Sequence, residues 1–225
     1  MAVKELFDRI AVRYDFFNCV SSFGIDKSWR RKLSSKLKSE KELKVLDIAT
    51  GTGEVLLSLF DNHCDILEAV GIDLSAEMLA AAEKKLTNYK VELKQADAKA
   101  IPFEDNYFDA LTCAFGVRNI LDLDTSLKEM LRVLKPAGKL LILEFSLPPN
   151  PLIKCFYLLY LKFYIPLLGT IITGDFAAYR YLSRTIQTFS SGKDFCRILQ
   201  TAGFKDVNAE PLTFGIVTLY SAYKR

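Results

Sequence analysis

Residues Lys44 to Glu54, KVLDIATGTGE, join a short apolar run to an acid and then to a Thr- and Gly-rich turn that opens an apolar helix. The apolar run is typical of a buried parallel strand. Gly51 and Gly53 permit a sharp turn and let the backbone approach a ligand where a Cβ would intrude. The stretch therefore predicts a strand-turn-helix junction that holds a nucleotide-like ligand, with Asp47 near the end of the strand. The alternative is a junction whose glycines only permit the bend.

A second apolar strand candidate, Ala69 to Asp73, also ends in an acid. Asp73 stands about 20 residues after the turn, the interval at which dinucleotide sites place a carboxylate for the ribose hydroxyls. The turn has no phosphate-binding Lys, and Leu56 and Leu57 stand where a G-x-G-x-x-G pattern would need glycine. We therefore expect a ligand that has a ribose but no pyrophosphate, and we assign Asp73 to that ribose.

The composition is that of an ordinary globular protein. Of the 225 residues, half are hydrophobic and a quarter are charged, and the net charge is +3. These values fit one domain spanning residues 1–225, and the small charge does not indicate a nucleic-acid partner.

Five cysteines without a C-x-x-C pair predict reduced thiols in a cytoplasmic protein. A single histidine, His63, leaves no ligand cluster for zinc, so we expect no metal site, and the charged first residues predict no signal peptide.

Strand and helix candidates alternate along residues 44–145. After the first junction, the expected strands are Ala69–Asp73, Val91–Ala96, Phe108–Phe115 and Leu140–Phe145, and the expected helices are Ala76–Leu86 and Thr125–Leu134. Right-handed crossovers convert this alternation into a doubly wound, mostly parallel α/β sheet with its ligand at the carboxyl ends of the strands. The sheet is expected to close with a hairpin of Asp206–Leu212 and Ile216–Tyr223. The groups expected at the ligand edge are Asp47, Asp73, Asp97 and the segment Gly116–Asn119.

Residues 1–40 predict a helical cap, with helices over Val3–Arg13 and Asp26–Leu37 on either side of the aromatic and polar segment Tyr14–Asn18. Residues 148–190 predict an apolar helical insertion. Within it, Leu152–Ile172 is almost wholly apolar but contains two lysines and Pro166. A membrane span needs about 20 uninterrupted apolar residues. We therefore expect a helix to about Tyr164 and a less regular piece after it. A cap on the core and an apolar surface for a lipid-like substrate both remain open, and they are compatible.

Several longer motifs carry a resemblance over nearly the full chain. These motifs are Arg13-Tyr14-Asp15, VLDIATGTG, GIDLSAEML, Asp97-Ala98 followed by IPFEDNYFDA, FGVRN, LRVLKPAGKLLILEF and GDFAAYRYL. With them the chain resembles the ubiquinone/menaquinone biosynthesis C-methyltransferases, whose fold is the Rossmann-like fold of methyltransferases dependent on S-adenosylmethionine (SAM). FGVRN and Tyr14-Asp15 are the most specific motifs, because neither is needed to hold a cofactor.

The resemblance implies SAM as the cofactor. Its contacts would be Thr52, Asp73, Asp97 and Ala98, together with Asp47, Gly51 and Gly53 of the first turn. Asp97 is equally compatible with a turn-stabilising role. Two positions depart from the family pattern, because Ala49 stands at the first glycine of the turn and Ala114 stands where several relatives carry a cofactor-binding Ser.

Arg118 and Asn119 are the candidate catalytic residues, since they follow a strand that should end beside the methyl donor. A cationic Arg118 would lower the pKa of a quinol hydroxyl, and Asn119 would orient the ring oxygen. Tyr14 is a third candidate, as a hydrogen-bond partner or proton relay. The alternative for Arg118 is a structural ion pair with Asp122 or Asp124.

The reaction that the resemblance implies is C-methylation of a prenylated quinol, preferably demethylmenaquinol to menaquinol. The alternatives are a SAM-dependent methyltransferase acting on another small phenol or lipid, and a catalytically silent SAM-binding protein, which would be expected to lose the polar strand-end groups. The expected location is the cytoplasm, with peripheral contact at the inner face of the membrane. The sequence distinguishes neither naphthoquinol from benzoquinol nor a monomer from a homodimer.

Overall fold

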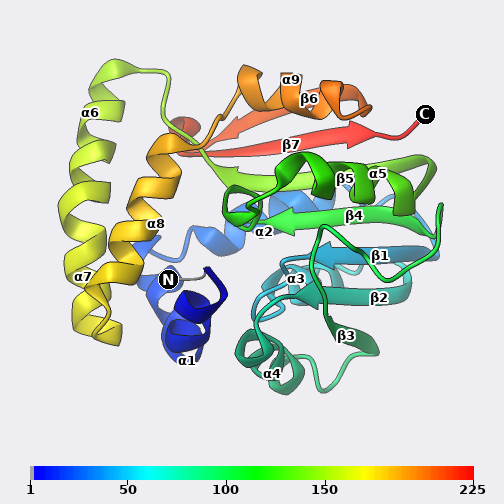
Figure 1. Ribbon diagram of the computed structural model, residues 1–225, viewed down its shortest axis with the longest axis horizontal. Helices are drawn as coiled ribbons and strands as arrows, with labels where there is room; N and C mark the ends of the chain where they lie inside the picture. Colours follow the sequence, from blue (N-terminus) through cyan, green and yellow to red (C-terminus); the bar gives the residue numbers. More distant parts are fainter. Residues whose placement is uncertain (1–2) are drawn as a thin grey trace.

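The computed structural model describes residues 3–225, which form a seven-stranded sheet flanked by helices (Figure 1). The strands are β1 (Leu43–Ile48), β2 (Ile66–Asp73), β3 (Val91–Gln95), β4 (Phe108–Ala114), β5 (Leu134–Phe145), β6 (Lys205–Leu212) and β7 (Val217–Tyr223), in the order β3-β2-β1-β4-β5-β7-β6. β1 to β5 pair in parallel, whereas β7 pairs antiparallel with β5 and with β6. The doubly wound sheet with a closing hairpin is therefore confirmed.

Helices cover both faces of the sheet, and each face has its own hydrophobic core. One face carries α2 (Asp26–Ser35), α3 (Glu54–Asp61) and α4 (Ala76–Lys85), and the other carries α5 (Leu123–Val133) and α9 (Lys193–Thr201). Successive side chains of β1 point to opposite faces, so that Val45 joins one core and Leu46 the other, both fully buried. The sheet is thus buried on both sides, as parallel sheets require.

The N-terminal helix is longer than predicted. α1 runs over Val3–Ser21, so the segment Tyr14–Asn18 is helical rather than a connection. No Gly or Pro interrupts it, and the Phe17 ring packs 4.1 Å from the Tyr179 ring, centroid to centroid. Packing against a distant helix therefore extends α1 beyond its predicted end.

The apolar insertion is more regular than predicted. It comprises α6 (Pro151–Leu159), a π-helical turn (Tyr160–Tyr164) and α7 (Ile165–Thr173), followed by α8 (Phe176–Thr188). Pro166 does not end the helix, because the residues before it, Tyr160–Tyr164, form a π-helical turn that already shifts the backbone hydrogen bonds by one residue. The N–H of Ile165 instead donates to the carbonyl of Tyr160, five residues back. The prediction of an irregular segment after Tyr164 is therefore wrong, because Ile165–Thr173 is helical.

Pro151–Thr173 is 23 residues long and, by length and composition alone, apolar enough to cross a membrane. Its inner side, however, packs against other helices of the protein. A Cβ on Gly169 would lie 2.0 Å from the Tyr179 ring, so α7 and α8 approach as closely as only glycine permits. Figure 1 shows α6, α7 and α8 standing to one side of the sheet, across the ends of its strands, with α1 beside them.

Candidate cofactor and substrate site

A cavity of about 280 Å³ opens at the carboxyl ends of β1, β2 and β4, between the sheet and α1. Of the residues predicted to contact the cofactor, those that line it are Gly51, Thr52, Asp73, Asp97 and Ala98. Tyr14 and Asn119, two of the predicted catalytic residues, line it as well. The topology therefore brings groups from five separate segments of the chain to one site.

Asp73 is held by the backbone of two turns. Its Oδ2 accepts the N–H of Gly51 and its Oδ1 accepts the N–H of Ser75, each at 2.9 Å. Each carboxylate oxygen can accept a further hydrogen bond, which suits a pair of adjacent hydroxyls. Burial raises the pKa of Asp73, and the two backbone N–H groups oppose that rise. Beside it, nothing lies within 4 Å of where a Cβ on Gly51 would be, so the turn leaves room for a ligand.

Two of the predicted contacts, Gly53 and Asp47, are absent from the cavity lining. Gly53 has φ +79°, and a Cβ there would lie 2.8 Å from Leu86, so this glycine lets α4 pack against the turn. Asp47 is only 1% exposed and lies in the sheet behind the lining, where its Oδ1 accepts a 2.6 Å hydrogen bond from Thr112. Burial raises the pKa of Asp47 to about 7.

Polar contacts tie α1 to the rim of the cavity. The Thr52 hydroxyl donates to Asp15 Oδ1 at 2.6 Å, and Lys85 pairs with both Asp15 and Glu54. Asp97 lines the cavity and also accepts the backbone N–H of Lys99 at 3.0 Å, so it stabilises a turn as well. The sequence identifies Asp15 only as part of a motif, because no local pattern shows that α1 folds back over the sheet.

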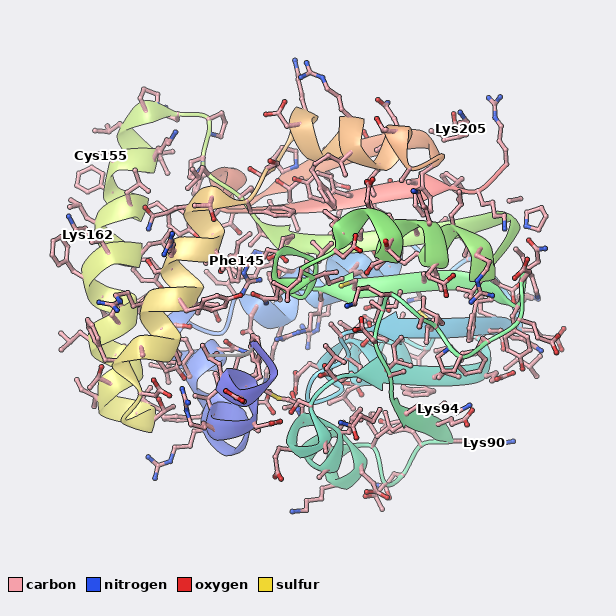
Figure 2. The ribbon with its side chains drawn as sticks, in the orientation of Figure 1. Lys90, Lys94, Phe145, Cys155, Lys162 and Lys205 are labelled. Atoms are coloured by element: carbon pink, nitrogen blue, oxygen red, sulfur yellow. The ribbon has the colours of Figure 1, made fainter. Side chains whose placement is uncertain are left out.

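A second cavity of about 350 Å³ adjoins the first and is mainly apolar. The residues that line both cavities are Tyr14, Asn18, Arg30 and Phe115. Aromatic rings make up much of the lining of the second cavity, and among them the Trp29 ring lies 6.0 Å from the Phe115 ring and 6.2 Å from the Phe145 ring, centroid to centroid. Figure 2 shows Phe145 between the end of the sheet and the insertion, whereas Cys155 and Lys162 lie on the outer side of the insertion. The second cavity therefore fits a flat apolar ring.

Arg118 lines the second cavity, and its ion-pair partner is Glu144. The two side chains are 1% and 0% exposed, and Arg118 Nη1 donates to Glu144 Oε1 at 2.6 Å. The alternative ion pair of Arg118 with Asp122 or Asp124 is therefore wrong. Asp122 instead caps α5 by accepting the N–H of Thr125, and within residues 3–225 Arg118 forms no ion pair with Asp124. Nε and Nη2 of Arg118 are buried without a hydrogen-bond partner among the residues described.

Tyr14 lines both cavities, whereas Asn119, which follows Arg118 in the chain, lines only the first. In the described part of the chain, the buried Oδ1 of Asn119 has no hydrogen-bond partner. Burial raises the pKa of Tyr14, and the nearby Arg118 lowers it by a smaller amount. The Tyr14 hydroxyl therefore stays protonated near neutral pH and can donate a hydrogen bond. Glu144, which no sequence pattern singled out, completes this group by holding Arg118.

The family model described as the ubiE/COQ5 methyltransferase family matches residues 1–224. A ubiquinone/menaquinone biosynthesis C-methyltransferase of Syntrophotalea carbinolica is 44% identical, over 97% of this chain and 92% of the relative. A demethylmenaquinone methyltransferase of Bacteroides fragilis is 40% identical, over 99% and 92%.

Among solved structures, a SAM-dependent methyltransferase of Thermotoga maritima, a possible histamine N-methyltransferase, superposes with a TM-score of 0.71 at 18% identity, covering 99% of both chains. Phosphoethanolamine N-methyltransferase 2 of Haemonchus contortus, solved with S-adenosyl-L-methionine, superposes with a TM-score of 0.64 at 20% identity, covering 87% of this chain and 52% of that one. These likenesses confirm the fold, while the full-length match and the 40–44% identities show the family. The chain belongs to the ubiE/COQ5 methyltransferase family.

Proposed function

We propose that this protein transfers a methyl group from SAM to a ring carbon of a prenylated quinol, preferably converting demethylmenaquinol to menaquinol. The observation that carries the proposal is the pair of adjoining cavities, one with a half-buried carboxylate held by two turns and the other walled by aromatic rings. The names of relatives that are 40–44% identical support the same reaction class.

The first cavity fits SAM. Asp73 would offer its two carboxylate oxygens to the ribose hydroxyls, Asp97 and Ala98 would contact the adenine, and the Gly51-Thr52 turn would hold the methionine part. Lys99 contacts both oxygens of Asp97, with its Nζ 3.4 Å from Oδ2 and its backbone N–H donating to Oδ1 at 3.0 Å, and each oxygen can accept a further hydrogen bond. The residues present therefore match a ligand that combines a ribose with an amino-acid group.

SAM, when bound, supplies an electrophilic methyl group. The protein must hold the ring carbon in line with that methyl and favour loss of a proton from the neighbouring hydroxyl, because a phenolate makes the ring carbon nucleophilic. The free N–H groups of Arg118 would bind the phenolate oxygen and Tyr14 would donate to it, while Asn119 Oδ1, an acceptor, would orient the ring hydroxyl before it loses its proton. Since Glu144 neutralises the net charge of Arg118, hydrogen bonding rather than net charge is the main contribution that we assign to Arg118.

The insertion would serve the prenyl tail and contact the membrane from the cytoplasmic side. Apolar residues that are 49–73% exposed follow one another at helical spacing along it: Leu152, Phe156, Leu159, Phe163, Leu167 and Ile171. Such a row covers more apolar surface than isolated exposed residues usually do. Phe156 also lines the second cavity, so it links the exposed row to the ring site.

An anaerobic assay with purified protein, SAM and demethylmenaquinol, read by mass spectrometry, tests the proposal. We expect a singly methylated quinol. Complementation of strains that lack either quinone methylation step then distinguishes naphthoquinol from benzoquinol substrates. SAM binding without methylation of either quinol would contradict the proposal and favour another phenol substrate or a silent binding protein.

A further inference from the structure

The second cavity contains a buried hydroxyl that the proposed reaction does not yet use. Tyr157 on α6 lines this cavity and is 6% exposed. Within residues 3–225 its hydroxyl oxygen has no hydrogen-bond partner. The neighbouring Tyr160 lines the same cavity, but its hydroxyl donates to the carbonyl of Ser21. Of these two tyrosines, therefore, only Tyr157 has a hydroxyl available to bind a ligand.

A buried polar group without a partner costs about 1–3 kcal/mol, so such groups commonly await a ligand or a bound water. Burial raises the pKa of Tyr157 well above its usual range, which keeps the hydroxyl protonated and able to donate. The other buried side-chain donors that lack partners on this cavity, in the part of the chain described, are Nε and Nη2 of Arg118. Arg118 and Tyr157 come from different elements, the turn after β4 and α6.

The helix holds the Tyr157 ring in place. The Tyr157 ring stacks on the Tyr160 ring at 6.1 Å, centroid to centroid. The Tyr160 ring in turn stacks on the Tyr164 ring at 5.1 Å. The π-helical turn Tyr160–Tyr164 follows directly, and π-helical turns occur frequently at functional sites. A ring fixed in this way keeps its hydroxyl in one place, which favours selective binding of an oxygen atom.

We propose that Tyr157 binds the second ring oxygen of the substrate, the one that does not meet Arg118, so that the cavity selects rings carrying two oxygen atoms. This inference rests on the proposed quinol methylation and adds a specificity-determining residue to it. Tyr157 would donate a hydrogen bond to the second oxygen and could also accept one from it, since a hydroxyl does both. A ring with a single hydroxyl would leave the buried Tyr157 group unpaired and would bind less tightly.

The test compares Tyr157→Phe with Tyr160→Phe on two tail-less rings, a dihydroxynaphthalene of the quinol type and the matching naphthol with one hydroxyl. Trp29, the only tryptophan, lines the second cavity, so quenching of its fluorescence reports ring binding independently of turnover. We expect Tyr157→Phe to weaken binding and kcat/KM for the two-oxygen ring about tenfold, and to change those for the naphthol by less than twofold. Tyr160→Phe should affect both rings equally.

SAM affinity by calorimetry and the melting temperature confirm that each variant is folded. The inference would be overturned if Tyr157→Phe lowered binding and kcat/KM equally for the two rings. It would also be overturned if the wild-type protein bound both rings equally well, a result that does not depend on any variant folding. If the wild-type protein methylates neither demethylmenaquinol nor these rings while fluorescence still shows a preference that depends on Tyr157, the proposed reaction fails and the role of Tyr157 in binding stands.

Discussion

At the scale of single residues, Asp73 is the clearest cofactor ligand to test. We expect Asp73→Ala to weaken SAM binding by about 1.5–3 kcal/mol, the size of charge-assisted hydrogen bonds to the ribose. The same carboxylate accepts two backbone N–H groups, so Asp73→Asn serves as the control, since its one amide oxygen can keep one of these bonds. Isothermal calorimetry on folded variants measures the effect. Undiminished affinity in Asp73→Ala would remove the residue from the site.

Arg118 requires a design that takes account of Glu144. Removing one member of a buried ion pair leaves the other charge unpaired and costs about 3–5 kcal/mol, so Arg118→Gln alone is expected to lose stability whatever its role. The double variant Arg118→Gln/Glu144→Gln removes both charges and should recover much of that loss. If Arg118 binds the ring oxygen, the double variant should keep its SAM affinity while kcat falls roughly 100-fold, about 2.7 kcal/mol of barrier. Recovery of kcat together with stability would assign the pair a structural role.

At the scale of elements, the insertion has two proposed functions, binding of the prenyl tail and contact with the membrane, and different residues allow each to be tested. Phe156 and Phe163 are 65% and 60% exposed, but only Phe156 also lines the second cavity. We expect Phe156→Ser to reduce turnover of a long-tailed quinol more than that of a tail-less analogue. Phe163→Ser should instead weaken sedimentation with anionic lipid vesicles and leave turnover of the tail-less analogue unchanged. Equal losses on both substrates from Phe156→Ser would indicate that the insertion only caps the core.

The insertion also shows how elements depend on their neighbours. Pro166 and two lysines within Leu152–Ile172 predict an interruption, because proline removes one helical hydrogen bond. The structure accommodates the proline through the π-helical turn before it and packs α7 on α8 at Gly169. Tertiary contacts therefore sustain a helix that the local sequence argues against.

At the scale of the whole molecule, Asp47 links stability to pH. Its folded pKa of about 7, raised by burial, lies above the usual value of about 3.9 in an unfolded chain. A raised folded pKa gives a contribution to stability that is present at low pH and is lost as the pH rises from about 4 through about 7. We expect Asp47→Asn, which can still accept from Thr112, to be more stable than wild type at pH 8, by roughly 4 kcal/mol at most, but not at pH 4.

Urea unfolding of both proteins between pH 4 and 8 measures this difference, and the comparison cancels the other titrating groups, such as Asp26, whose pKa is lowered in the folded state. A difference in unfolding free energy that stays constant over that range would show that Asp47 does not titrate there.

The sequence by itself determined the features that arise within one segment or from regular alternation. The turn after β1, the acid at the end of β2, the Ser75 cap of α4 and the parallel sheet with its hairpin all follow from short-range patterns. Five of the seven predicted cofactor residues line the first cavity for the same reason, since parallel strands end at one edge.

Only the tertiary structure decided the contacts between residues that lie far apart in the sequence. Glu144 pairs with Arg118 from 26 residues away, Gly53 is required by the packing of α4, and Tyr157 meets the ring site because the insertion folds back over the strand ends. Those contacts depend on which segments pack together, and no short-range pattern records that.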